Sequence, residues 1–208
     1  SFPTRRSSDL IGEIVYGLSI GYIAAFIFYV IDVWLPNKSE QKKINDRLAV
    51  PLSRLLNNIK IPLERVYEEY GAEKHEFDSI TKEVHNNIVS KMDLINDEAP
   101  MIYYSPNRNA NYGEYLYYHI ESVNRYIENV YKLPIPLDIE LVEILDDLAT
   151  SSYHEIMTSA NNITQFRKNL VQMKGYAINK EFYEYRSMYF KLKKHMRENN
   201  IKLTINNL

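Results

Sequence analysis

The chain has 208 residues, 25 Lys and Arg against 27 Asp and Glu, and no cysteine. This length suffices for one or two domains, and the lack of cysteine excludes a disulfide scaffold, a cysteine zinc site, a thiolate nucleophile and an iron–sulfur cluster. The formal charge of −2 gives no overall attraction to nucleic acid, so we do not expect a nucleic-acid partner.

The first ten residues, SFPTRRSSDL, resemble the conceptual translation of a short-read sequencing adapter, and the match covers all ten positions. We therefore expect residues 1–10 to be an artefactual scar joined in frame to a gene fragment, with native residues preceding Ile11. The alternative is a genuine N-terminus with an arginine pair. Arg5 and Arg6 are left out of the topology argument for this reason.

Residues 11–36 predict a transmembrane helix. The run Ile14–Ile31 holds 18 residues without a charge, and extension to Leu35 gives 22 residues with a single charge. At 1.5 Å per residue the longer span covers roughly 33 Å, against a hydrocarbon core of about 30 Å. A signal peptide would need a basic start and a cleavage site of small residues. A buried core helix is the other alternative.

Two features of this span suggest contacts inside the membrane. Gly17, Gly21 and Ala25 are spaced by four and form a stripe of small residues, which allows a second copy of the helix to approach closely. Asp32 either reaches into the headgroup layer, paired with Lys38, or makes a polar contact between helices or belongs to an ion path, because charge inside a membrane is costly. The stripe predicts a homo-oligomer.

Basic residues follow the span, and only one acid precedes it once the scar is removed. They are Lys38, Lys42, Lys43, Arg47 and Arg54. Because Lys and Arg are retained on the cytoplasmic side, the C-terminal domain is expected to be cytoplasmic. The first three lysines are also candidate contacts for lipid headgroups.

The segment GLSIGYIAAFIFYVIDVWLP, followed by lysines, resembles the single membrane helix of many uncharacterised bacterial proteins. The likeness is confined to this segment, and it is carried by Ile20, Gly21, Tyr22, Ile23, Ile27, Phe28, Tyr29 and Pro36. It implies an anchor in the bacterial inner membrane and no assigned activity. Pro36 is expected to end the helix, and Asp32 stands where an apolar residue is more usual.

Apolar residues at helical spacing dominate the rest of the chain. Residues 37–61 predict a juxtamembrane amphipathic helix that Pro51 kinks or divides, and Pro62 suits the start of the next helix. Residues 62–208 predict a helical domain. Strand signals are almost absent, and residues 97–111, with Pro100 and Pro106, predict a loop.

Three further helices are predicted in the C-terminal half. One is lined by Leu116, Ile120, Val123, Ile127 and Val130, one runs from Asp138 to Met173, and the last carries Phe182, Tyr185, Met188 or Tyr189, Leu192 and Met196. The predicted fold is therefore all-α, one transmembrane helix followed by an antiparallel bundle of four to five helices. A fold-back at Gly175 is expected to bring Glu155 near Lys194 and His195.

Motifs for known chemistry are absent from the sequence. None of the five histidines has a glutamate three residues before it, which excludes the usual di-iron bundle. The zinc-protease spacing and the phosphate-binding glycine loops are absent as well. We therefore expect no catalytic residue, no metal site and no cofactor, and His195 is expected to pair with Glu198 at the surface.

Basic and aromatic residues alternate near the C-terminus. Four of the bases are further candidates for lipid-headgroup contact: Lys191, Lys193, Lys194 and Arg197. In the simplest interpretation, a terminal helix packs its aromatic rings inward and leaves its charges in water. Base stacking on a nucleic acid is the least favoured alternative.

These patterns favour a membrane-anchored helical interaction or scaffold protein. Its expected partners are the lipid bilayer, a second copy of the chain and a further protein that the sequence does not identify. The first alternative is a membrane-disrupting effector or toxin that oligomerises through its transmembrane helix. The second is a membrane-tethered enzyme with an unrecognised site, which would require polar side chains to converge inside the bundle.

Overall fold

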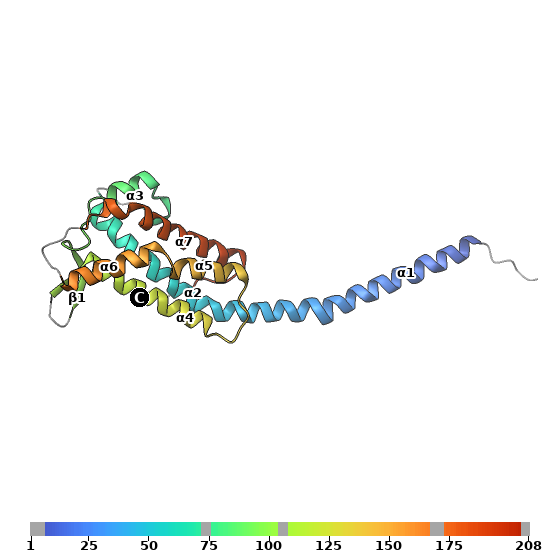
Figure 1. Cartoon of the computed structure of the whole chain (residues 1–208). Helices are drawn as coiled ribbons and strands as arrows, with labels where there is room; N and C mark the ends of the chain where they lie inside the picture. Colours follow the sequence, from blue (N-terminus) through green and yellow to red (C-terminus); the bar gives the residue numbers. More distant parts are fainter. Residues whose placement is uncertain (1–6, 72–75, 104–107, 167–172, 205–208) are drawn as a thin grey trace, which may run out of the picture. The chain divides into compact units, whose positions relative to one another are not determined.

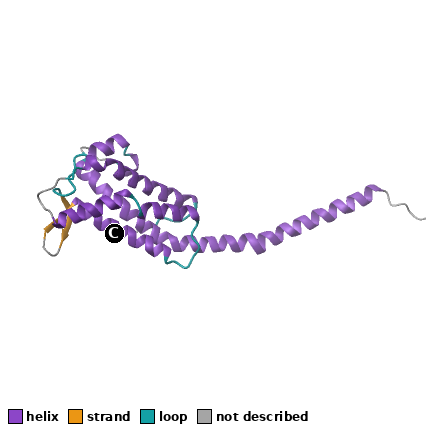
Figure 2. Ribbon diagram, viewed as in Figure 1, coloured by secondary structure: helices purple, strands orange, loops and turns teal. Residues whose placement is uncertain are grey.

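A computed structural model of the chain describes residues 7–71, 76–103, 108–166 and 173–204, and most of these residues are helical (Figures 1 and 2). The all-α prediction is confirmed. His75 and most of the expected scar lie outside the described residues. The chain divides into two compact units, Ser1–Ile44 and Asn45–Leu208, which are described separately.

The first unit is helical throughout its described part. Helix α1 (Ser7–Tyr29) leads through a π-helical turn, η1 (Val30–Trp34), into helix α2 (Leu35–Tyr70). Pro36, which was expected to end the helix, lies near the beginning of α2. In η1 the Leu35 N–H donates to the carbonyl of Val30, five residues earlier. This wider turn makes room for the proline ring, which has no N–H to offer and collides with a carbonyl in a regular α-helix.

One helical stretch in the described part of the chain, Ile11–Tyr70, is long and apolar enough to cross a membrane. None of its most apolar 18-residue window is buried inside the structure. Its large side chains are exposed on all sides, among them Leu18, Tyr22 and Phe28. The core helix of a soluble domain buries such a surface against its own chain, and this helix does not.

Helix α2 continues through Pro51 and Pro62, so Pro51 does not divide it and the helix start expected at Pro62 is wrong. The alternative of a kink at Pro51 stays a prediction. A proline inside a helix costs about 3 kcal/mol. Each fully buried leucine or isoleucine returns about 1.5–3 kcal/mol, and α2 buries a continuous apolar face of Leu48, Leu52, Leu55, Leu56, Ile59, Leu63 and Val66. Tertiary packing therefore outweighs the local preference of the two prolines.

The described residues of the second unit form five further α-helices. They are α3 (Lys82–Val89), α4 (Tyr112–Tyr131), α5 (Ile139–Ala149), α6 (Ser152–Phe166) and α7 (Asn179–Glu198). Short 3-10 turns, η2 (Phe77–Ser79) and η3 (Gly175–Ile178), precede α3 and α7. The pattern from Asp138 to Met173 was expected to form one helix, but α5 ends at its C-cap Thr150, whose backbone, at φ −102° and ψ 12°, has left the helical region.

Contacts between helix ends show that three pairs of helices in this unit run antiparallel: α2 with α4, α4 with α6, and α2 with α7. The rings of Tyr70, at the end of α2, and Tyr112, at the start of α4, have centroids 5.4 Å apart. The Asn111 amide, just before α4, donates to the Thr164 hydroxyl near the end of α6 at 2.9 Å. The Asn45 amide, where α2 enters this unit, donates to the carbonyl of Asn199 at the end of α7 at 2.6 Å.

The centre of the core is aromatic. Tyr153 of α6 stacks on Tyr185 of α7 with ring centroids 4.2 Å apart, and Phe182 meets Tyr153 edge-on at 4.8 Å. All three rings are buried. The apolar face predicted for the last helix is confirmed, and Tyr189 is its buried member while Met188 is only partly buried.

The region predicted as a loop contains a two-stranded antiparallel sheet. Strand β1 (Glu98–Tyr103) pairs with β2 (Arg108–Asn111), and Glu98 lies opposite Asn111. The Asn111 side chain accepts from the Glu114 N–H at 2.9 Å, while the Glu114 carboxylate accepts from the Asn111 N–H at 3.0 Å. This capping box fixes the end of β2 at the start of α4, a constraint that strand periodicity does not reveal.

Candidate functional site

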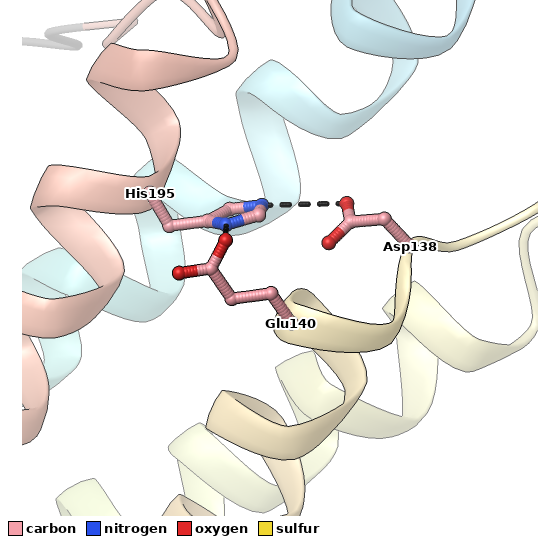
Figure 3. Close-up of side chains that lie close together, drawn as sticks. All are labelled: Asp138, Glu140 and His195. Carbon is pink, nitrogen blue, oxygen red and sulfur yellow. Dashed lines mark ion pairs between the residues drawn. The ribbon is translucent and has the colours of Figure 1, made fainter.

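His195 lies between two carboxylates at the place where α5 begins and α7 ends (Figure 3). Its Nε2 is 3.4 Å from an oxygen of Asp138, and its Nδ1 is 3.3 Å from an oxygen of Glu140. The imidazole is buried at 1% exposure, whereas the two acidic side chains remain half or more exposed. Within the described residues, this is the one group of three or more acids and histidines that could hold a metal ion.

Local structure holds each of these side chains in place. Asp138 is the N-cap of α5, and its other oxygen accepts from the N–H of Leu141 at 2.9 Å. Glu140 lies in the first turn of α5, where the helix dipole favours an anion, and His195 lies in the last turn of α7, where the dipole favours a cation. Both helix ends therefore favour the signs of charge that an ion pair at this position requires.

The geometry fits an ion pair better than a metal centre. Only the protonated imidazole can donate from both ring nitrogens, one to each carboxylate. A metal ion would take a single ring nitrogen, whereas the two carboxylates here lie at different ring nitrogens, Asp138 at Nε2 and Glu140 at Nδ1. Glu140 would have to turn away from Nδ1 to complete a metal shell.

The sequence misplaced the partners of His195. Glu155 lies at the start of α6, where its neighbour His154 faces the hydroxyl of Tyr185, ten residues before His195 on α7. The predicted pairing of His195 with Glu198 is also wrong, because Glu198 lies 3.8 Å from Lys194. The break after Thr150 causes the first error, since it makes α5, and not α6, the neighbour of the end of α7.

Three other histidines are buried or partly buried and uncharged. Burial lowers the pKa of His85, His119 and His154 to about 4 in each case. His85 Nε2 donates to the carbonyl of Asn179 at 3.1 Å, and its Nδ1 therefore accepts from the hydroxyl of Tyr67 at 2.8 Å. In the described part of the chain none of the three is paired with a carboxylate, so no acid–base pair for catalysis forms around them.

The stripe of small residues lies on an open helix face. A Cβ atom added to Gly17 or Gly21 would meet nothing within 4 Å, and Ala25 is exposed. Asp32 lies in η1 and is exposed, and Lys38 places its ammonium 4.7 Å from the centre of the Trp34 ring. Association through the stripe and a role for Asp32 stay predictions.

The candidate headgroup contacts on α2, Lys42 and Lys43, are exposed. Of those on α7, Lys193 lies 2.6 Å from Asp78, Lys191 lies 3.8 Å from Asp147 and Lys194 lies 3.8 Å from Glu198. Arg197 is exposed and has no acidic partner among the described residues. The buried rings of α7 pack inward, as the simplest interpretation expected, and are not available to stack on bases.

Comparison of the chain with protein-family models, with curated proteins and with solved structures finds no match. Any function must therefore be argued from the geometry and chemistry of the residues themselves.

Proposed function

We propose that the chain is a single-pass protein of the bacterial inner membrane that presents its second unit to the cytoplasm as an interaction or scaffold domain. The span is Ile14–Leu35, and the partners are the bilayer, a second copy and a further protein. One observation carries the proposal: an apolar helix long enough to span a bilayer has none of its most apolar window buried by its own chain.

The orientation rests on charge. Five basic residues follow the span between Lys38 and Arg54, and Glu13 is the charge on its other side once residues 1–10 are set aside. Lys and Arg near the end of a span are retained in the cytoplasm. The exposed ammonium groups of Lys42 and Lys43 are free to meet the anionic inner leaflet, each contributing about 1 kcal/mol.

Anchoring supplies a mechanism for an interaction domain without a catalytic site. Confinement to a membrane replaces encounter in three dimensions with encounter in two, which raises the effective concentration of the domain toward any membrane-bound partner. The interior of the second unit supports this function over the enzyme alternative. Among the described residues His85 and His154 have no carboxylate partner, as a catalytic acid–base pair would require, and His195 already lies between two carboxylates.

Membrane fractionation tests the proposal. The full chain, expressed in bacterial cells, should sediment with membranes, resist extraction by high salt and alkaline carbonate, and dissolve in detergent. Its mass should be that of the unprocessed chain, which separates an anchor from a cleaved signal sequence. The variant Phe26→Lys with Ile27→Lys places two charges in the span at a cost of about 2.5–3.5 kcal/mol each. It should release the protein into the soluble fraction, whereas Lys180→Gln, at an exposed position of α7, should not.

Recovery of the unmodified chain in the supernatant without detergent would overturn the anchor. Growth arrest on expression that Gly21→Ile abolishes would instead favour the membrane-disrupting alternative, because isoleucine blocks close helix approach at the stripe.

A further inference from the structure

An open groove of about 550 Å³ lies at the C-terminal end of α7. It is lined by Asp78, Phe190, Lys193, Lys194, Met196, Arg197, Ile201 and Leu203. Most of the lining is apolar, and Leu203, in the segment after α7, keeps half of its surface exposed. The groove therefore combines an apolar floor with cationic side chains, the two surfaces that an amphiphile with an anionic head requires.

The charge around the groove is positive on balance. Lys193 is engaged by Asp78 at 2.6 Å, and Lys194 reaches Glu198 only at 3.8 Å with both side chains at least half exposed. Arg197 is exposed and unpaired within the described residues. The charge of Arg197 is therefore not neutralised by a described acid, and that of Lys194 is only weakly paired. Both cations are available to an incoming anion.

A further cation lies behind the floor of the groove. Arg186 is buried at 5% exposure, and its guanidinium carbon lies 4.8 Å from the centre of the Phe190 ring and 5.2 Å from that of Phe77. It donates to the carbonyl of Phe77, and no carboxylate lies within ion-pair distance of it among the described residues. A buried charge without a counter-charge projects its field further than a solvated one. Its effect here is to favour an anion at the groove.

The groove lies at the end of the second unit where the chain from the span enters. The Asn45 amide donates to the carbonyl of Asn199, and the Thr204 N–H donates to the hydroxyl of Ser53 at 3.0 Å. The segment from 199 to 204 is thereby fixed to the first turns of α2 in this unit. Ten residues lead from Leu35 to Asn45, so even a fully extended chain places Asn45 within about 35 Å of the end of the span.

We propose that this groove binds an anionic phospholipid of the bilayer in which the chain is anchored. The phosphate of the headgroup meets Arg197 and Lys194, and the first methylenes of the acyl chains lie on Ile201, Leu203 and Phe190. The inference rests on the proposed anchoring, because the tether is what brings lipid within reach. It names a specific lipid contact for the domain, in addition to the general attraction of lysines to the membrane surface.

The test uses the full chain in nanodiscs of phosphatidylcholine, alone or with phosphatidylglycerol. Hydrogen exchange of residues 193–204 should slow only in discs that contain phosphatidylglycerol. Native mass spectrometry of the detergent-solubilised chain should show phosphatidylglycerol bound at least tenfold more tightly than phosphatidylcholine. The variant Lys194→Glu with Arg197→Glu should weaken phosphatidylglycerol binding at least tenfold, since each base near an anionic lipid contributes roughly fivefold. Leu203→Ser should weaken it severalfold without changing any charge.

Two controls keep the outcomes separate. Lys180→Glu, an equally exposed charge reversal at the other end of α7, should leave binding unchanged. Incorporation into discs of phosphatidylcholine alone reports the anchor and does not depend on the groove. A chain that stays out of every disc contradicts the anchor; the groove is then tested in solution with short-chain phosphatidylglycerol below its micelle concentration. Equal binding of the two lipids, or full binding by the Lys194→Glu, Arg197→Glu variant, overturns the groove.

Discussion

His85 and His154 are buried among aromatic side chains and are held neutral. Burial lowers the pKa of each to about 4, against an ordinary value near 6.5. Between these two pH values the histidine is protonated in the unfolded chain and neutral in the folded chain. The contribution of each neutral histidine to the free energy of unfolding is therefore fully present above about pH 7 and is lost as pH falls through 6.5 toward 4. One such histidine lowers the free energy of unfolding by about 2 kcal/mol between pH 8 and pH 5.

This dependence is testable with His154→Phe, which keeps a ring of similar size but cannot titrate. Urea unfolding of the detergent-solubilised chain, followed at pH 8 and pH 5, should show a smaller loss of stability for the variant, by about 2 kcal/mol. Thr158→Val, on the same helix, should keep the dependence of the parent. An unchanged loss in His154→Phe would show that this histidine is not held neutral.

Gly175 is a position where the chain accepts no side chain. A Cβ atom built there would lie 1.8 Å from the carbonyl oxygen of Val89, and the backbone of both residues would have to move apart. We expect Gly175→Ala to lower the free energy of unfolding by at least about 2 kcal/mol, the cost of overpacking against backbone. Gly12→Ala, where nothing lies within 4 Å, is the matched substitution and should leave thermal unfolding unchanged.

At the scale of elements, the contact of α5 with α7 depends on the ion pair at His195. Asp138→Asn keeps an N-cap side chain but removes its charge, and Glu140→Gln does the same on the other side of the ring. Each should show a coupling of about 1 kcal/mol with His195→Gln in a double-mutant cycle at pH 7. Asp138→Ala should cost about 1 kcal/mol more than Asp138→Asn, because it also removes the cap of α5.

The same variants distinguish an ion pair from a metal site. If the pair accounts for the geometry, neither a chelator nor added zinc should move the melting temperature of the parent chain. A melting temperature that falls with chelator, and does so only while His195 is intact, would assign a metal to these three residues instead.

Helical periodicity located α4 and α7 well, because a regular apolar stripe such as Leu116–Val130 or Phe182–Met196 is set by burial on one face. Periodicity did not predict where the helices begin and end. Pro36 was expected to end a helix, Pro51 to kink or divide one and Pro62 to start one. A π turn accommodates Pro36 instead, and packing outweighs the preference of the other two. The strands β1 and β2 were missed because neither shows an alternation of apolar and polar residues, although Asn111 and Glu114 have the spacing of the capping box that starts α4.

The candidate site was also predicted only in part. The sequence showed that α5 is acidic and that the end of α7 is basic, but not which acids reach His195. That choice depends on the break at Thr150, where the backbone leaves the helical conformation although the apolar pattern continues. The groove at Phe190 and Leu203 could not be predicted from the sequence, because its lining residues come from three separate segments: η2, α7 and the segment after α7.

At the scale of the whole molecule, the two units are expected to respond differently to urea. Trp34, the single tryptophan, belongs to the first unit, whereas the aromatic core of Tyr153, Phe182 and Tyr185 belongs to the second. In detergent micelles, urea should abolish the near-ultraviolet circular dichroism of the tyrosines. The blue-shifted emission of Trp34 should persist, because a helix in an apolar phase satisfies its own backbone groups.

A coincident loss of both signals would show that the two units unfold as one. The variant Leu55→Ala, which removes a fully buried side chain of the second unit, should lower the tyrosine transition by about 2–5 kcal/mol and leave the tryptophan emission as it is.

The hydrogen bonds that join residues 45 and 53 to residues 199 and 204 can form only late in synthesis, because the partners lie at opposite ends of the sequence of the second unit. The apolar face of α2 leaves the ribosome long before α7 and the segment after it have been translated. Until the last segment emerges, this leucine-rich surface has no permanent cover, so nascent chains stalled before α7 are the species most prone to aggregate or to recruit chaperones.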